Sequence, residues 1–98
     1  MPKLAALAAS RGLAAFVPTF PALTCSAQST FLTGLPPSGH GIVGNGWYNR
    51  ELCEVQFWKQ PDQLVKGNKL WHHLRARHPG ATTAKTFWWY NMYSEVEH

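Results

Sequence analysis

Thr24 is the residue best placed for chemistry, because it carries a hydroxyl at the start of a predicted helix. A proline-punctuated, extended segment over residues 18–23 precedes it, and the helical pattern of residues 25–33 ends at Gly34. Backbone N–H groups and the helix dipole at such a position attract anions. A phosphoryl group bound there would present its phosphorus to the Thr24 hydroxyl. The alternative is that Thr24 only caps the helix.

The neighbouring Cys25 is a second candidate nucleophile. A thiol at a helix N-terminus has a lowered pKa, and a cysteine-based hydrolase would also need a partner histidine. We prefer an inert, packed thiol, because no spacing in the sequence indicates that partner. Cys53, the other cysteine, lies too far away for a disulfide framework or a zinc motif. We therefore expect two free or buried thiols.

The histidines do not predict a metal site. His72, His73 and His78 lie on or near one predicted helix, but His78 is off the four-residue spacing that places two imidazoles on one face. His40 lies in a loop rich in proline and glycine, where we expect packing or loop hydrogen bonds rather than catalysis.

Basic residues alternate with tryptophans in the second half of a chain whose formal net charge is +4. Rings over a positive groove can bind single-stranded nucleic acid. We prefer a solvated basic helix face beside core tryptophans, so nucleic acid is not an expected partner. The residues of this stripe are Lys59, Lys66, Lys69, Arg75, Arg77, Trp58 and Trp71.

A longer ordered pattern surrounds Thr24. It runs from Phe20-Pro21-Ala22-Leu23-Thr24 through Thr33-Gly34 to His40-Gly41-Ile42 and Asn45. This pattern resembles the type I phosphodiesterase/nucleotide pyrophosphatase branch of the alkaline phosphatase superfamily. The resemblance is strong over about residues 2–60 and looser over the aromatic tail.

The resemblance implies that Thr24 is the nucleophile, which takes the phosphoryl group in a covalent intermediate. It implies that Asn45 hydrogen-bonds a non-bridging phosphate oxygen. It also implies two divalent metal ions, usually zinc, to which Thr24 binds through its nucleophilic oxygen in the complete family site. The implied substrate is a small phosphate ester or a nucleotide-like molecule. Residues 25–28 depart from the Phe-Pro-Asn-His of nucleotide pyrophosphatases, so the resemblance does not assign a nucleotide.

Composition limits this expectation. Asp62 is the only aspartate among five carboxylates, whereas the metal ligands of the family are Asp and His residues that Asp62 and His40 do not match. We therefore expect the N-terminal, nucleophile-bearing part of a phosphoesterase domain, inactive as an isolated chain. The alternative is a small non-catalytic module that binds nucleic acid or another anion through Trp58, Trp71, Trp88 and nearby bases.

Length and composition predict a single partial domain over residues 1–98, with no internal boundary. A hydrophobic content of 45% excludes a disordered linker. No apolar run approaches the ~20 residues of a membrane-spanning helix. We interpret the Leu/Ala-rich start as a helix rather than a signal peptide, which favours the cytoplasm. The oligomeric state stays open.

The elements that must position these residues alternate between helix and strand. We expect helices over residues 2–11 and, with Thr24 as its N-cap, over residues 25–33. Another helix is expected to carry Leu70, Trp71 and Leu74 on one face. Residues 35–41 are expected to form an irregular loop, and residues 47–58 a hairpin or extended arm. Buried strands are expected over residues 13–17 and 85–90, with the rings of Trp88, Trp89 and Tyr90 on alternating faces. This order predicts an α/β fold, which the resemblance makes a partial alkaline-phosphatase-like domain with a few strands of a mixed or parallel sheet.

Overall fold

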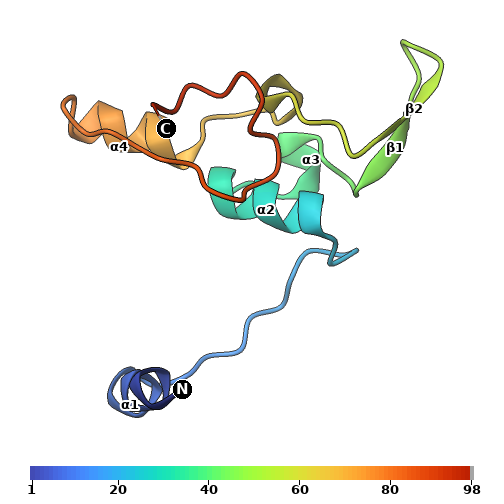
Figure 1. Ribbon diagram of the computed structural model, residues 1–98. Helices are drawn as coiled ribbons and strands as arrows, with labels where there is room; N and C mark the ends of the chain where they lie inside the picture. The colour runs from blue at the N-terminus through green and yellow to red at the C-terminus, as the bar shows by residue number, and fades with distance from the viewer. Residues whose placement is uncertain (98) are drawn as a thin grey trace.

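The computed structural model describes residues 1–97. Apart from the first helix and the extended segment after it, the helices form a body that carries a two-stranded sheet (Figure 1). Helices and a sheet together confirm the α/β class. No helix in this part of the chain is long and apolar enough to cross a membrane. The elements are α1 (Pro2–Arg11), α2 (Thr24–Thr33), α3 (Pro37–His40), β1 (Gly46–Asn49), β2 (Glu54–Phe57), the 3-10 helix η1 (Asp62–Leu64) and α4 (Leu70–Arg77).

Helix α2 forms the centre of the body. Leu23, with extended backbone, occupies the N-cap position, so Thr24 is the first helical residue and not the cap. Ser26 Oγ donates hydrogen bonds to the carbonyls of Pro21 and Leu23 at 3.0 and 3.1 Å, which fixes the turn that leads into the helix. Gly34 ends α2 at φ 69°, a left-handed conformation that glycine adopts without a Cβ clash.

Helix α1 has the predicted bounds but lies apart from the body, at the end of an extended segment (Figure 1). The strand predicted over residues 13–17 is wrong, since Leu13 and Val17 are 90% and 95% exposed. An apolar run becomes a strand only where a neighbouring strand completes its backbone hydrogen bonds, and no described segment does so here. The radius of gyration is consequently 16.1 Å, against about 13 Å for a compact chain of this size.

The hairpin predicted over residues 47–58 is confirmed. Strands β1 and β2 pair antiparallel, with Gly46 opposite Phe57 and Asn49 opposite Glu54. A Cβ at Gly46 would lie 2.4 Å from Phe57 Cδ2, so this close pairing requires glycine. Within residues 1–97 this is the only sheet, so the expected mixed or parallel strands are not formed there.

The strand predicted over residues 85–90 is not formed, because the backbone bends there. Phe87 and Tyr90 have positive φ values, which interrupts the alternation predicted for the three successive rings. Tyr90 turns inward and is 1% exposed, while Phe87 is fully exposed. Lys85 and Tyr90, at the two ends of this stretch, are both buried in the body.

The predicted loop over residues 35–41 contains the single-turn helix α3. Pro37 stands at its first position, where a missing N–H has no cost, and Gly41 ends it at φ 82°. His40, its last residue, is fully buried. The sequence prediction missed this turn because prolines and glycines usually indicate irregular loops.

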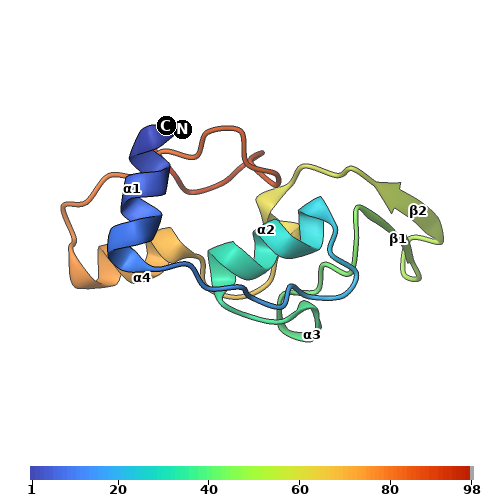
Figure 2. The same cartoon turned by 90° about the horizontal axis from the view of Figure 1, so that it is seen from below.

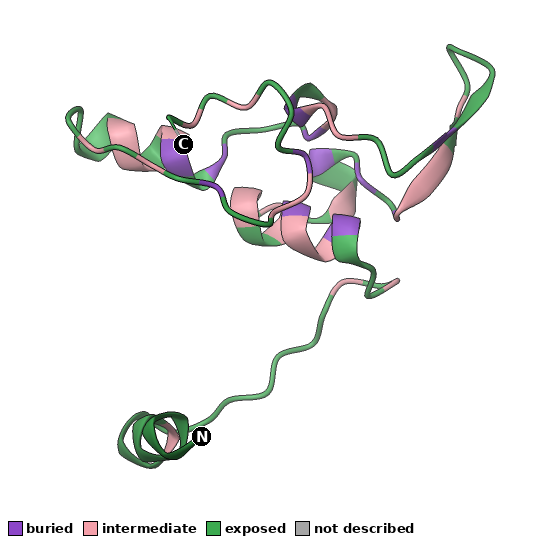
Figure 3. Ribbon diagram, viewed as in Figure 1, coloured by how far each residue is buried: buried purple, intermediate pink, exposed green. Residues whose placement is uncertain are grey.

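The core is small and lies between α2, α3, η1 and the C-terminal segment (Figure 3). Its fully buried members come from four separate parts of the chain, and Trp47, Leu64 and Trp89 pack around them. The core members are Cys25, Ile42, Val65 and Tyr90.

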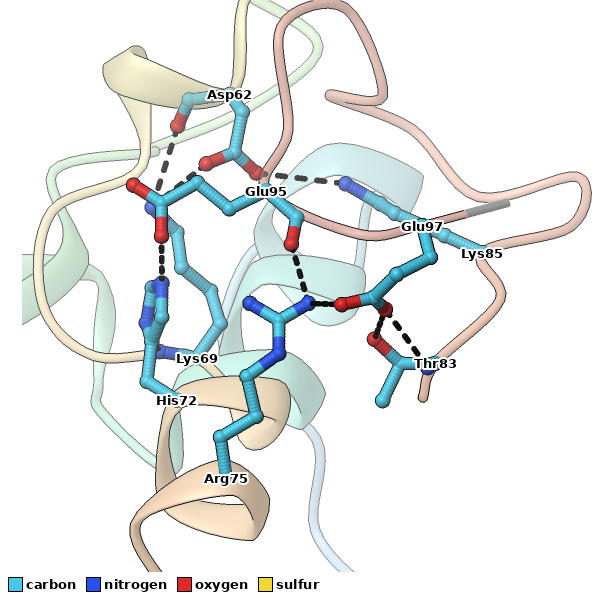
Figure 4. Close-up of polar contacts among 8 residues, drawn as sticks. All are labelled: Asp62, Lys69, His72, Arg75, Thr83, Lys85, Glu95 and Glu97. Carbon is cyan, nitrogen blue, oxygen red and sulfur yellow. Dashed lines mark hydrogen bonds and ion pairs between the residues drawn. The ribbon is translucent and has the colours of Figure 1, made fainter. Parts of the chain in front are cut away.

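A buried ion cluster joins η1, α4 and the C-terminal segment (Figure 4). Lys69 Nζ lies 2.9 Å from Asp62 Oδ2, and Lys85 Nζ lies 3.4 Å from Asp62 Oδ1. All three side chains are less than a tenth exposed, so Lys69 does not belong to the solvated helix face that we expected. The Lys85 ammonium also donates to the Tyr90 carbonyl and lies 5.0 Å from the centroid of Trp71.

The C-terminal residues are held on α4 by a second set of polar contacts (Figure 4). The Arg75 guanidinium pairs with the Glu97 carboxylate, and the backbone N–H and hydroxyl of Thr83 donate to Glu97 Oε2 at 2.9 and 3.0 Å. The Thr83 N–H is the main reason that the pKa of Glu97 falls to about 2. His72 Nδ1 accepts the Lys69 N–H, which leaves Nε2–H to donate to Glu95 at 3.3 Å.

Candidate functional site

The fold brings the two predicted site residues together at the N-terminus of α2. The backbone N–H of Cys25, the residue after Thr24, donates a hydrogen bond of 3.0 Å to Asn45 Oδ1. The first N–H groups of a helix have no partner within it, so Asn45 caps α2 from 20 residues away in sequence. Thr24 is exposed and makes no side-chain capping bond of its own.

Asn45 is held on both its side chain and its backbone. Its carbonyl accepts the N–H of Trp58 at 2.9 Å, which continues the β1–β2 ladder by one bond. Because Oδ1 accepts from Cys25, the two N–H donors of the Asn45 amide stay available beside the N-terminus of α2. A hydroxyl, an amide donor and a helix N-terminus are therefore close together, and all three suit an anion.

Cys25 is not the activated thiol that a helix N-terminus can produce. It is fully buried, and burial raises the pKa of its thiol, although the Tyr90 hydroxyl partly opposes this rise. The thiolate is the nucleophile in cysteine chemistry, so a raised pKa makes Cys25 unreactive. The inert, packed thiol is thus the correct interpretation, and Cys53 is the second free cysteine.

His40 connects α3 to α2 by hydrogen bonds, as expected for a loop-stabilising role. Its Nδ1 accepts the Ile42 N–H at 3.1 Å, so Nε2 carries the proton and donates to Thr30 Oγ1 at 3.0 Å. Burial lowers the pKa of His40, which keeps the ring neutral. Both nitrogens are used internally, and neither is free to bind a ligand.

The residues that the structure describes do not fit a two-metal centre. Asp62 holds two buried ammonium groups, and both nitrogens of His40 and of His72 are engaged. Residues 1–97 contain no group of three or more His, Cys, Asp or Glu side chains that could bind a metal ion. Of the metal contacts that the resemblance implies, the described residues offer only the hydroxyl of Thr24.

Several residues of the alternative binding module are buried or paired. Trp71 is 4% exposed and lies in the body, so its ring cannot stack on a base. Lys69 and Lys85 are engaged by Asp62, and Arg75 is engaged by Glu97. The basic stripe therefore does not form a continuous positive groove.

Two contributors to the site were missed by the sequence analysis. Gln28 Oε1 accepts the N–H of Trp89 at 2.7 Å, across 61 residues of sequence, and Tyr90 packs against Cys25 in the core. Both contacts attach the C-terminal segment to the first two turns of α2. No local pattern indicates them, because each depends on how distant segments pack.

Together these features place a hydroxyl and an amide donor at a helix N-terminus, a combination whose chemistry suits an anion such as a phosphoryl group. A family model described as Type I phosphodiesterase / nucleotide pyrophosphatase matches residues 1–98, and the chain belongs to this family. Membership relates the chain to phosphodiesterase- and pyrophosphatase-type hydrolases, suggests phosphate-ester or nucleotide substrates and implies metal-dependent catalysis in general. No curated protein and no solved structure matches it.

Proposed function

We propose that this chain supplies the nucleophile and a phosphate-binding amide of a phosphoric ester hydrolase. Thr24 is the residue that takes the phosphoryl group, and Asn45 donates to a non-bridging phosphate oxygen. The observation that carries the proposal is the 3.0 Å hydrogen bond from the Cys25 N–H to Asn45 Oδ1, which holds the amide beside Thr24. Thr24, the neighbour of Cys25, and Asn45 are both residues that the sequence motif selects independently of any structure.

The proposed reaction has two displacement steps. Thr24 Oγ1 forms a bond to phosphorus while the bond from phosphorus to the ester oxygen breaks; the hydroxyl loses its proton, and the leaving oxygen gains one. Water then attacks the phosphorus of the phosphothreonine and its bond to Thr24 Oγ1 breaks, which restores the hydroxyl and releases inorganic phosphate from a monoester or a phosphate monoester from a diester. Asn45 would stabilise charge on the phosphoryl oxygens in both steps, as amide donors do in other acyl- and phosphoryl-transfer sites.

The proposed site is incomplete within residues 1–97. A threonine hydroxyl is almost un-ionised near neutral pH and needs activation, which the family provides with metal ions. Asp62 and His40 are engaged elsewhere, and residues 1–97 contain no group of three or more His, Cys, Asp or Glu side chains that could form a ligand set. We therefore propose that the chain by itself does not hydrolyse phosphate esters, and that the metal ligands come from residues other than these.

A graft tests the role of Thr24. Residues 20–45 of this chain replace the matching segment of an active family member, and hydrolysis of 4-nitrophenyl phosphate esters is measured with zinc. The graft should retain activity, and Thr24→Ala in the graft should lower kcat by at least ~10³-fold, because nucleophile loss removes the covalent step. Full activity of the Thr24→Ala graft would contradict the nucleophile assignment.

The proposal that the chain is inactive by itself is tested with the isolated chain in buffer containing zinc. The chain should hydrolyse the same esters no faster than that buffer does, while the active family member, assayed in parallel, hydrolyses them. Zinc-dependent turnover by the chain that disappears in Thr24→Ala would contradict the proposal that the metal ligands lie elsewhere.

A further inference from the structure

We propose that the side-chain amide of Gln28 donates a hydrogen bond to a second non-bridging oxygen of the phosphoryl group held at Thr24 and Asn45. The inference rests on the proposed function, because it adds a binding residue to the same site. Gln28 lies in the segment 25–28, where the chain departs from nucleotide pyrophosphatases, so the resemblance assigns it no role. With Gln28, the site has two neutral amide donors, one for each of two phosphoryl oxygens.

Gln28 lies one helical turn after Thr24, on the same face of α2. Residues four apart in a helix are neighbours on its surface, with Cβ atoms roughly 5–6 Å apart. Helical side chains also lean toward the N-terminus and cover the turn that precedes them. This geometry directs the Gln28 side chain toward the turn of α2 that begins with Thr24.

One contact distinguishes the oxygen of the Gln28 amide from its nitrogen. The backbone N–H of Trp89 donates to Oε1 at 2.7 Å. A glutamine amide has one acceptor oxygen and a nitrogen with two N–H donors. Because a donor faces Oε1, the nitrogen is the atom left for a ligand, and no hydrogen bond within residues 1–97 uses it. The Asn45 amide has the same division, since its Oδ1 accepts the Cys25 N–H.

A closed series of contacts places both amides on one side of α2. Asn45 accepts the Cys25 N–H through Oδ1 and the Trp58 N–H, at 2.9 Å, through its backbone carbonyl. The ring centroids of Trp58 and Trp89 are 4.7 Å apart, and the N–H of Trp89 leads back to Gln28. Cys25 and Gln28 are three residues apart in α2, so the series ends on neighbouring positions of one helix. The Asn45 and Gln28 amides are therefore held near each other by contacts that exist before a ligand binds.

Two amide donors suit the oxygens of a phosphoryl group at this position. Both monoesters and diesters have at least two non-bridging oxygens, so Asn45 and Gln28 can each donate to a different one. The positive end of the helix dipole favours the same anion. Hydrogen bonds to a charged acceptor are stronger than those between neutral groups, and the loss of one weakens binding by about tenfold or more.

The first test titrates the full chain, labelled with ¹⁵N, with inorganic phosphate and follows side-chain amide signals by NMR. The signals of Asn45 and Gln28 should move together and give one dissociation constant. The signal of Gln63, an exposed glutamine of η1, should not move. Movement of the Asn45 signal without that of Gln28 would overturn the assignment of Gln28.

Three variants separate donation to phosphate from packing against Trp89. Gln28→Met removes both the acceptor and the donors at similar side-chain length, whereas Gln28→Glu keeps an acceptor for the Trp89 N–H and has no N–H donor. Gln63→Met makes the first change away from the site. Both Gln28 variants should bind inorganic phosphate at least about tenfold more weakly than the unmodified chain, and Gln63→Met should bind it normally. Without ligand, the backbone N–H signal of Trp89 should move further in Gln28→Met than in Gln28→Glu.

The outcomes separate the Gln28 assignment from the proposed function. Normal binding by Gln28→Glu would show that Gln28 only anchors Trp89, and normal binding by Gln28→Met would show that the glutamate acts only by repulsion. Either result, or weak binding by Gln63→Met, overturns the assignment and leaves the proposed function standing. If inorganic phosphate does not bind, or binds Asn45→Ala as well as the unmodified chain, the proposed function fails, and the Gln28 assignment fails with it.

Discussion

The oxygen and the nitrogen of the Asn45 side-chain amide have different roles. Oδ1 accepts the Cys25 N–H and so caps α2, while the N–H donors are the groups proposed to bind phosphate. The two roles can be separated by substitution, because an aspartate keeps an acceptor at the position of Oδ1 and has no donor. A carboxylate there is also favoured by the positive end of the helix dipole.

We predict that Asn45→Ala lowers the free energy of unfolding by about 1 kcal/mol, the usual cost of a lost N-cap. It should also abolish the chemical-shift changes that inorganic phosphate induces in a ¹⁵N NMR titration of the chain. Asn45→Asp should retain the stability of the unmodified protein but should not bind phosphate, because its charge repels the anion. Urea unfolding and the phosphate titration measure the two effects. An Asn45→Asp protein that binds phosphate normally would show that the amide is not the donor.

His40 makes stability depend on pH through burial. An unfolded imidazole titrates near 6.5, and burial lowers the pKa of His40 in the folded protein. Between 6.5 and the lower folded value, the unfolded chain binds more protons than the folded one. Stability is therefore fully present above this window and is lost as the pH falls from 6.5 toward the folded pKa.

We predict that urea unfolding from pH 7.5 to 5.5 shows this loss, with a slope of up to about 1.4 kcal/mol per pH unit. His40→Asn is the matched variant, since its Oδ1 can accept the Ile42 N–H in place of Nδ1 but cannot titrate. It should be less stable at pH 7.5 because the bond to Thr30 is lost, and its stability should fall less between the two pH values. Parallel pH profiles for the two proteins would contradict this account.

At the scale of elements, the ion pairs of Asp62 join three parts of the chain that no sheet connects. It belongs to η1, Lys69 precedes α4 and Lys85 lies on the C-terminal segment. The cluster contains two ammonium groups for one carboxylate, and burial lowers the pKa of Lys85. Removal of the carboxylate would leave both cations buried without a counter-charge, which costs more than the ion pair contributes.

We predict that Asp62→Asn lowers the free energy of unfolding by about 3–5 kcal/mol. Glu54→Gln is the control, because it removes a carboxylate from the exposed pair with Lys59, at 3.6 Å, and should cost less than about 1 kcal/mol. Urea unfolding compares the two variants. Similar small losses in both variants would mean that the buried lysines do not need the charge of Asp62.

The elements show which features a sequence can predict. Helix periodicity and terminal residues correctly predicted α1, α2 and α4, because these signals are local. The predictions of strands over residues 13–17 and 85–90 were wrong, because a strand needs a partner strand that the local sequence does not identify. For the site, the motif selected Thr24 and Asn45. It could not predict the Cys25 contact or the role of Gln28, which depend on packing between distant segments.

At the scale of the whole molecule, the protein is a small body with a detached N-terminal arm. Seen from below, the extended segment after α1 runs past α2, while α1 itself contributes no residue to the core (Figure 2). The ring centroids of Phe16 and Phe31 lie 6.0 Å apart in an edge-to-face contact. The arm, which is α1 and the extended segment after it, therefore contacts the body through residues that follow Gly12. Body stability should therefore come from residues 13–97 alone.

We predict that deletion of residues 1–12 changes the free energy of unfolding of the body by less than about 0.5 kcal/mol, as expected where no buried contact is lost. In contrast, Ile42→Ala, which removes part of one fully buried side chain, should cost about 2–5 kcal/mol. Near-UV circular dichroism under increasing urea reports on the core tryptophans in both variants. Hydrogen exchange should also show little protection in α1, because an isolated ten-residue helix is marginally stable. A destabilisation by the deletion that approaches that of Ile42→Ala would mean that α1 packs on the body in solution.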